Sequence, residues 1–192
     1  MLCARLRPAY RDAAAGALEE VARIVRQVRQ RWPEVKIVLR ADSGFCREEL
    51  MAWGEANRVD YVLGLARNSR LRKLIDAPIA EAKALHESTS QAGRVFSGFA
   101  YRTLTSWSCE RRVVAKSEHL DQGENPRFVV TSLSPDEVPD RELYERLYCA
   151  RGEMENRIKE QMCLFADRLS TCAIEANQLR LYLSATMVRN AG

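Results

Sequence analysis

The sequence predicts an α/β domain, because helix-type and strand-type apolar patterns alternate along its first third. Residues 12–31 carry apolar side chains three and four positions apart, the spacing of a helix that packs on a sheet. Residues 36–42 form a short apolar run that ends in an acid, and residues 59–65 form a second apolar run. Residues 47–57 fit a helix between them, so the order of elements is typical of an α/β fold.

The segment before the first helix completes one supersecondary unit. Residues 2–6 fit an edge strand that Pro8 stops. With helix 12–31 and strand 36–42, they predict a β-α-β unit with a crossover helix. We therefore assign residues 1–67 to the first part of the core.

The middle of the chain changes in character. Residues 68–123 begin with a helical stretch that Pro78 interrupts, and strands are expected at 93–104 and 109–116. This pattern predicts an inserted β-rich lobe.

Residues 124–192 are expected to complete the core. A strand at 127–133 would rejoin the main sheet, and helices are expected at 141–163 and 171–189.

Length and composition agree with one substantial core. The chain has 192 residues, of which 46% are hydrophobic. No apolar run approaches the roughly 18 residues of a membrane span, and the amino terminus lacks a signal-peptide pattern, so we expect a cytoplasmic protein without membrane contact. The six cysteines include no Cys-x-x-Cys pair, and only two histidines are present. A zinc ribbon, a disulfide framework and a histidine-based metal or nucleophile site are therefore poorly supported.

Charge permits contact with nucleic acid without requiring it, since the net charge is +4 and the pI about 8.8. Basic residues cluster after one predicted strand and along another: Arg67, Arg70, Arg72 and Lys73, then Arg111, Arg112 and Lys116. Such clusters are either solvated faces or phosphate-binding surfaces.

One helix face carries a candidate site. Tyr148, Arg151, Glu155 and Lys159 recur three or four residues apart and so share a face. This layout suits a metal ion on Glu155 with the cations on phosphates, or else it is a solvated ladder of ion pairs. Glu153 is the alternative acid, but it lies on a different face.

Asp42 is the second candidate. It follows a predicted strand, and the carboxyl ends of strands in open α/β sheets are where sites are built. The alternative role is a cap for the Ser-Gly turn that follows.

These segments together resemble a known family. The strings Arg-Ala-Asp-Ser-Gly-Phe at 40–45, Asn-Pro-Arg-Phe-Val-Val-Thr at 125–131, the 148–159 segment, Leu-Phe-Ala-Asp-Arg at 164–168 and Ala-Asn-Gln-Leu-Arg at 176–180 look like bacterial insertion-sequence transposases, closest to the thirteen-eighty family. The resemblance runs in order along nearly the whole chain. It implies a DDE transposase with a ribonuclease H-like catalytic core, in which a β-rich insertion separates the second acid from the third.

The resemblance also implies roles for single residues. Asp42 would be the second acid of the triad and Glu155 the third, holding Mg²⁺ or Mn²⁺. Tyr148, Arg151 and Lys159 would contact DNA phosphates near the cut end. DNA, both the transposon ends and the target, would be the partner, and the active form would be a homodimer.

Two departures from the family pattern matter. A further lysine is expected seven residues after the glutamate, where this chain has Met162. The first catalytic Asp should lie on an earlier strand, yet only Asp12 precedes Asp42, and we expect Asp12 to supply a helix-start charge. The sequence therefore predicts an amino-terminally incomplete core that is inactive, or nearly so, by itself.

Three other functions are weighed against this one. A non-catalytic remnant would bind only DNA or full-length partners. A resolving or repair nuclease would need a complete acidic cluster, which is not evident. A tyrosine recombinase using Tyr148 would need an Arg-His-rich site, which two scattered histidines do not suggest.

Overall fold

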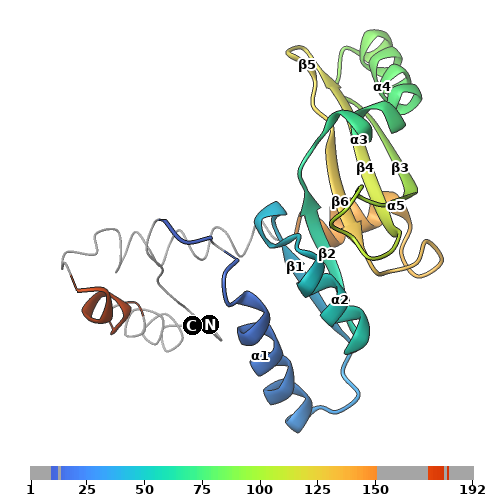
Figure 1. Cartoon of the computed structure of the whole chain (residues 1–192). Coiled ribbons are helices and arrows are strands. Elements are labelled where there is room, and N and C mark those ends of the chain that lie inside the picture. The colour runs from blue at the N-terminus through green and yellow to red at the C-terminus, as the bar shows by residue number, and fades with distance from the viewer. Residues whose placement is uncertain (1–9, 13, 151–172, 180, 182–192) are drawn as a thin grey trace, which may run out of the picture. The chain divides into compact units, whose positions relative to one another are not determined.

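The computed structural model describes residues 10–12, 14–150, 173–179 and 181 (Figure 1). The chain divides into two compact units, Met1–Pro33 with Arg151–Gly192, and Glu34–Ala150, which we call the central unit. The predicted edge strand at 2–6 lies outside the described residues. No helix in the described part is long and apolar enough to cross a membrane.

The helix of the first unit begins later than the sequence predicts. Helix α1 spans Ala17–Arg31, because Gly16 at its amino end adopts the left-handed conformation with φ 72°. Asp12 instead caps the preceding turn, where its Oδ1 accepts the backbone N–H of Ala14 at 2.8 Å. Asp12 therefore lies before the helix rather than in its first turn.

The central unit is built on one mixed sheet, which confirms the predicted α/β class. Its strands within the described residues are β1 (Ile37–Ala41), β2 (Val59–Leu65), β3 (Gly93–Tyr101), β4 (Arg111–Leu120), β5 (Gly123–Glu124) and β6 (Arg127–Thr131). The order across the sheet is β1-β2-β6-β4-β3, with β5 paired to β4. Only β1 and β2 run parallel, joined by helix α2 (Glu48–Ala56), and the other pairs are antiparallel.

Side chains alternate between the two faces of the sheet, as strand geometry requires. On one face Tyr61, Leu63 and Phe128 pack with residues of α2, α3 (Ser69–Leu74) and α4 (Asp76–Thr89). On the other face Val62 and Val129 pack against Leu143 and Tyr144. These last two belong to η2 (Leu143–Tyr148), a π-helical turn that continues the short helix α5 (Asp140–Glu142). The sheet is thus covered by helices on both faces.

The break in the helical stretch after β2 lies at Ile75 and not at Pro78. Helix α3 ends at Leu74 and α4 begins at Asp76, so Pro78 falls in the first turn of α4, where a missing N–H costs nothing. Ile75 is fully buried and forms part of the core beneath the sheet. The sequence prediction was wrong about the role of the proline.

The strands of the predicted β-rich lobe extend this same sheet. Strand β4 pairs with β6 along five residues, and β6 pairs with β2. The division of the chain at residues 67 and 123 stays a prediction about domains. What the pairing shows is that β3 and β4 share a sheet with β1 and β2.

Candidate functional site

Asp42 lies at the carboxyl end of β1, where strand β1 turns into a short 3₁₀ segment, Ser43–Phe45. Its Oδ1 accepts the backbone N–H of Gly44 at 2.9 Å, so the predicted capping role is observed. The residue is exposed. A carboxylate offers about four lone-pair positions, so this bond does not by itself exhaust the acceptor positions of Asp42.

Tyr148 reaches this strand end because Gly64 has no side chain. A Cβ placed on Gly64 in β2 would lie 2.6 Å from the Tyr148 Oη and 2.9 Å from the backbone nitrogen of Ser43. Both distances are shorter than real Cβ contacts. Glycine inside a strand often marks such a close approach. The end of β1, the carboxyl-terminal part of β2 and the end of η2 therefore meet at Gly64.

Arg40 ties the end of η2 to β1. Its Nη1 donates to the carbonyl oxygen of Leu147 at 2.8 Å. The turn η2 is π-helical, with the N–H of Cys149 donating to the carbonyl of Tyr144 at 3.0 Å. Single π-helical turns are rare in proteins as a whole, and those that occur often lie at functional sites. Arg40 thus holds the carbonyl next to Tyr148 against the strand that ends in Asp42.

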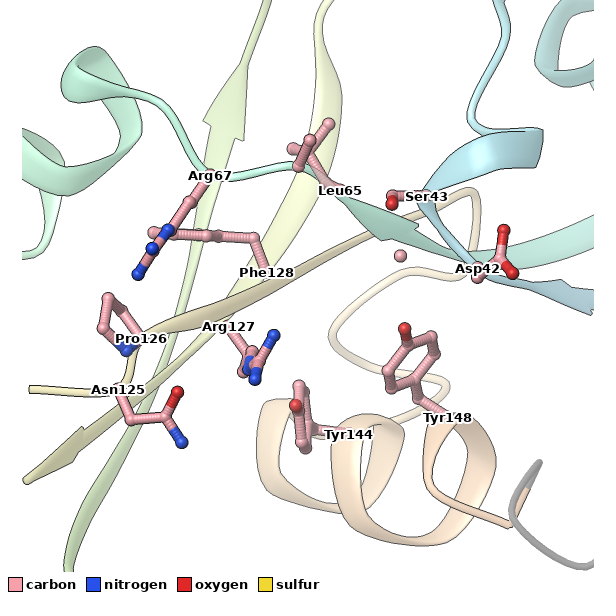
Figure 2. A pocket seen from close by; sticks show the side chains of 12 residues that line it. Asp42, Ser43, Leu65, Arg67, Asn125, Pro126, Arg127, Phe128, Tyr144 and Tyr148 are labelled. Atoms are coloured by element: carbon pink, nitrogen blue, oxygen red, sulfur yellow. The ribbon is translucent and has the colours of Figure 1, made fainter. Parts of the chain in front are cut away.

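A pocket of about 800 Å³ opens at this meeting point (Figure 2). Its volume lies within the roughly 300–1,000 Å³ of ligand pockets. Strand ends, the turn before β6 and η2 supply its walls: Asp42, Ser43, Gly64, Leu65, Ala66, Arg67, Asn125, Pro126, Arg127, Phe128, Tyr144 and Tyr148. The pocket therefore brings together two residues that the sequence predicted, Asp42 and Tyr148.

Of the two phenols that η2 contributes to the pocket, that of Tyr144 stays protonated over the ordinary pH range. Burial raises the pKa of Tyr144, with smaller contributions from Cys149 and Tyr148. The rings of Tyr144 and Tyr148 lie 5.5 Å apart between centroids. Tyr144 therefore adds no charge, and the acidic and basic side chains that line the pocket are Asp42, Arg67 and Arg127.

Most of the basic residues that the sequence grouped into clusters have internal partners. Arg72 pairs with Glu124 and Asp76, and Arg70 lies over the Tyr101 ring. The cations of strand β4 are engaged too: Arg111 with Glu48 and Glu55, Arg112 with Asp140, and Lys116 with Glu118. Of the clustered arginines, Arg67 alone lines the pocket.

Arg127 is a pocket residue that the charge clusters missed. It is the only basic residue of β6, so no run of charges marks it. The strand alternation could have found it, because Phe128 and Val130 face one core cluster and Val129 the other. Arg127 shares the face of Val129, on which Tyr144 also packs.

The rest of the predicted site lies outside the described residues. Arg151, Glu155 and Lys159, and the alternative acid Glu153, fall in the segment 151–172. Their roles stay predictions.

The residues that the structure describes hold no preassembled metal-binding cluster. Among those residues, no group of three or more His, Cys, Asp or Glu side chains could hold a metal ion. Mg²⁺ is commonly held by one or two carboxylates together with substrate phosphates. Asp42, an exposed oxygen donor in a pocket with two cations, fits one position of such a site.

Comparison with known proteins connects this geometry to a family. No curated protein matches the chain. The family model described as "Transposase DDE domain group 1" matches residues 1–188, which is almost the full length. The chain therefore belongs to the group 1 family of transposase DDE domains.

Proposed function

We propose that this chain is a catalytic segment of a DDE transposase that cuts and joins DNA strands at the ends of an insertion sequence. Membership of the DDE family indicates transposition and DNA as the partner. The observation that carries the finer proposal is the pocket, which joins an acid at a strand end to a phenol and two guanidinium groups. Such a pocket suits a phosphodiester that is held beside a metal ion.

In this proposal Asp42 and Glu155 are the second and third acids and hold Mg²⁺ or Mn²⁺. Ions held there would supply Lewis-acid polarisation of the scissile phosphate. Tyr148 donates its phenolic hydrogen to a DNA phosphate, and Arg151 and Lys159 add charge-assisted contacts. Gly64 and Arg40 set the position of Tyr148 relative to Asp42.

Further features follow the family resemblance. We propose a ribonuclease H-like core of the thirteen-eighty type, a β-rich insertion at 68–123, a homodimeric active form and action in the cytoplasm. Asp12 is an unsuitable first acid, because it lies in a turn in front of α1 and not on a strand. With two acids assigned, we expect weak strand transfer by this chain alone.

The decisive experiment compares neutral variants of acids. DNA binding in Mg²⁺ and in EDTA, and Mn²⁺-dependent nicking of a supercoiled plasmid, would be measured for Asp42→Asn and Glu155→Gln. Asp136→Asn is the matched control for the first variant, because Asp136 is exposed and outside the pocket. Glu153→Gln is the control for the second, because it changes the alternative acid two residues away.

We expect metal to strengthen DNA binding in the wild type and in both controls, but not in Asp42→Asn or Glu155→Gln. Any nicking should be lost in the same two variants. DNA binding that ignores both the metal and Asp42 would contradict the proposal and favour a non-catalytic DNA-binding remnant. A loss in Glu153→Gln with normal Glu155→Gln would move the third acid to Glu153.

A further inference from the structure

The two arginines of the pocket differ from the other arginines of the central unit. Within the described residues, the guanidinium groups of Arg67 and Arg127 form no hydrogen bond or ion pair. Every other arginine of residues 34–150 has a polar or ring partner. The two unpaired guanidinium groups are exposed, and both line the same pocket.

The sheet register explains why the two arginines meet. Leu65 at the end of β2 is the partner of Phe128 in antiparallel β6, so Arg127 lies level with the residue that follows Leu65. Arg67 is one position further along. Ala41 of parallel β1 pairs with Leu63, which places Asp42 at the same edge of the sheet. Two chain segments that are 60 residues apart in sequence therefore present their cations in the pocket that Asp42 also lines (Figure 2).

We propose that Arg67 and Arg127 bind the phosphodiester backbone of the DNA strand that passes Asp42. This assignment rests on the proposed function, since it takes the ligand to be DNA. Guanidinium groups match phosphate oxygens with two parallel hydrogen bonds, and an arginine is always charged. The site reads the backbone and not the base sequence.

The charge of the pocket supports a strand of phosphates over a single small anion. The two arginines and Asp42 lie at separate positions along a pocket of about 800 Å³, instead of converging on one centre. Asp42 would repel an anion next to it unless a cation intervenes. Phosphates on the Arg67–Arg127 side of the pocket avoid that repulsion and lead the strand toward Asp42.

The test is the salt dependence of DNA binding in EDTA, where the metal-dependent steps are silent. A labelled duplex of arbitrary sequence would be titrated between about 50 and about 200 mM salt with Arg67→Gln, Arg127→Gln and the double variant. Each lost phosphate contact lowers the slope of log Kobs against log[salt] by about 0.9. The control is Arg141→Gln, which removes the same charge from an exposed arginine that pairs with Glu145 at 2.9 Å and lies outside the pocket.

We expect each pocket variant to flatten the slope by about one, the double variant by about two, and the control by much less. An unchanged slope, or equal flattening in Arg141→Gln, would overturn the inference. Wild-type protein that binds no DNA would overturn it together with the proposed function. Flattening in the pocket variants, with no effect of metal on DNA binding by the wild type, would leave the inference standing and remove the catalytic proposal.

A separate arm distinguishes DNA from free phosphate. Inorganic phosphate would be titrated by calorimetry at constant ionic strength. We expect no saturable binding, because no single position collects all the cations. Saturable phosphate binding that is lost in both arginine variants, without a change in DNA salt slope, would assign the site to a free anion instead.

Discussion

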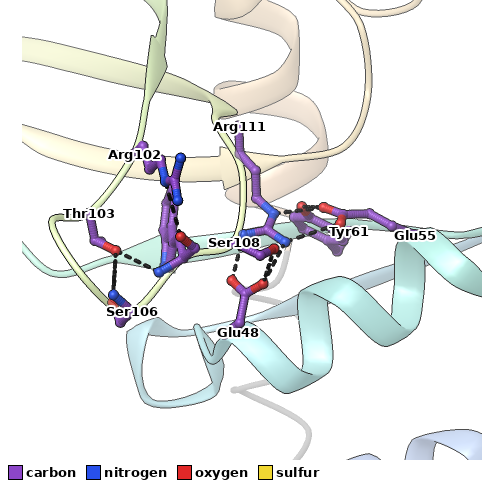
Figure 3. Close-up of polar contacts among 9 residues, drawn as sticks. Glu48, Glu55, Tyr61, Arg102, Thr103, Ser106, Ser108 and Arg111 are labelled. Carbon is purple, nitrogen blue, oxygen red and sulfur yellow. Dashed lines mark hydrogen bonds and ion pairs between the residues drawn. The ribbon is translucent and has the colours of Figure 1, made fainter.

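Replacing Arg111 with methionine should lower the free energy of unfolding of the central unit by more than a charge change at the surface does. Arg111 is the first residue of β4, and its side chain is 2% exposed. The guanidinium group lies between two glutamates of α2 (Figure 3). Its Nε and Nη1 donate to Glu55 and Glu48, each at 2.6 Å. Tyr61 donates to the same Glu55 at 2.6 Å, and the guanidinium lies 5.5 Å from the centre of the Trp107 ring. The group joins α2, β2 and β4.

The size of the effect follows from what the substitution leaves behind. Removing one partner of a buried ion pair costs about 3–5 kcal/mol, mostly because the remaining charge is left uncompensated. Glu48 and Glu55 are 26% and 35% exposed, so water partly solvates them. We therefore expect the lower end, about 3 kcal/mol, for Arg111→Met.

Urea unfolding followed by circular dichroism would measure the loss. With an m-value of about 1–3 kcal/mol per molar urea, the midpoint should fall by about 1–3 M. Arg146→Met is the control, because Arg146 is 78% exposed and its pair with Glu142 is worth less than about 1 kcal/mol. Adding Glu48→Gln and Glu55→Gln to the Arg111 variant should restore part of the stability. A midpoint for Arg111→Met within error of the control would refute the reasoning.

Two further predictions concern acid and the meeting point of the pocket. The hydrogen bond from Arg111 lowers the pKa of Glu48 to about 2, below its ordinary 4.5. Between these two pH values the unfolded chain binds more protons than the folded chain, so stability should fall as the pH drops from about 4.5 to about 2. Thermal unfolding midpoints measured across that range would show the fall, and their pH dependence should be weaker in Arg111→Met. An equal pH dependence in the variant would contradict the link between Arg111 and the pKa of Glu48. Gly64→Ala should cost about 1–3 kcal/mol, since its Cβ would press on Tyr148 and Ser43. Metal-stimulated DNA binding should fall with it. Stability should recover in part in Gly64→Ala/Tyr148→Phe, whereas a double variant no more stable than the single one would place the strain elsewhere.

The sequence predicted the local elements of the central unit well. Predicted strands 36–42 and 59–65 correspond to β1 and β2, and predicted helix 47–57 corresponds to α2. These elements carry their signal in neighbouring residues, as apolar runs or as helical spacing. The position of Asp42 at a strand end followed from the same local signal.

Long-range pairing was beyond the sequence. The order β1-β2-β6-β4-β3 brings β6 between β2 and β4, and nothing near Arg127 in the chain indicates that Arg67 will lie beside it. For a related reason, the clusters of basic residues in the sequence did not identify which cations line the pocket. Whether a cation is available depends on acids far away in sequence, as with Arg111, whose partners Glu48 and Glu55 precede it by about 60 residues.

The presence of Asp42 in the pocket allows a catalytic pocket to be distinguished from a pocket that only binds DNA. A carboxylate beside two phosphate-binding arginines weakens anion binding unless a cation is bound to it. The Asp42→Asn variant should therefore bind DNA more tightly than the wild type in EDTA and yet gain nothing from Mg²⁺. A protein that used this pocket only to hold DNA would gain from losing the acid under both conditions. A gain in DNA binding from Mg²⁺ that is present in the wild type and absent in Asp42→Asn would therefore tie the acid to a bound metal ion, as a catalytic role requires.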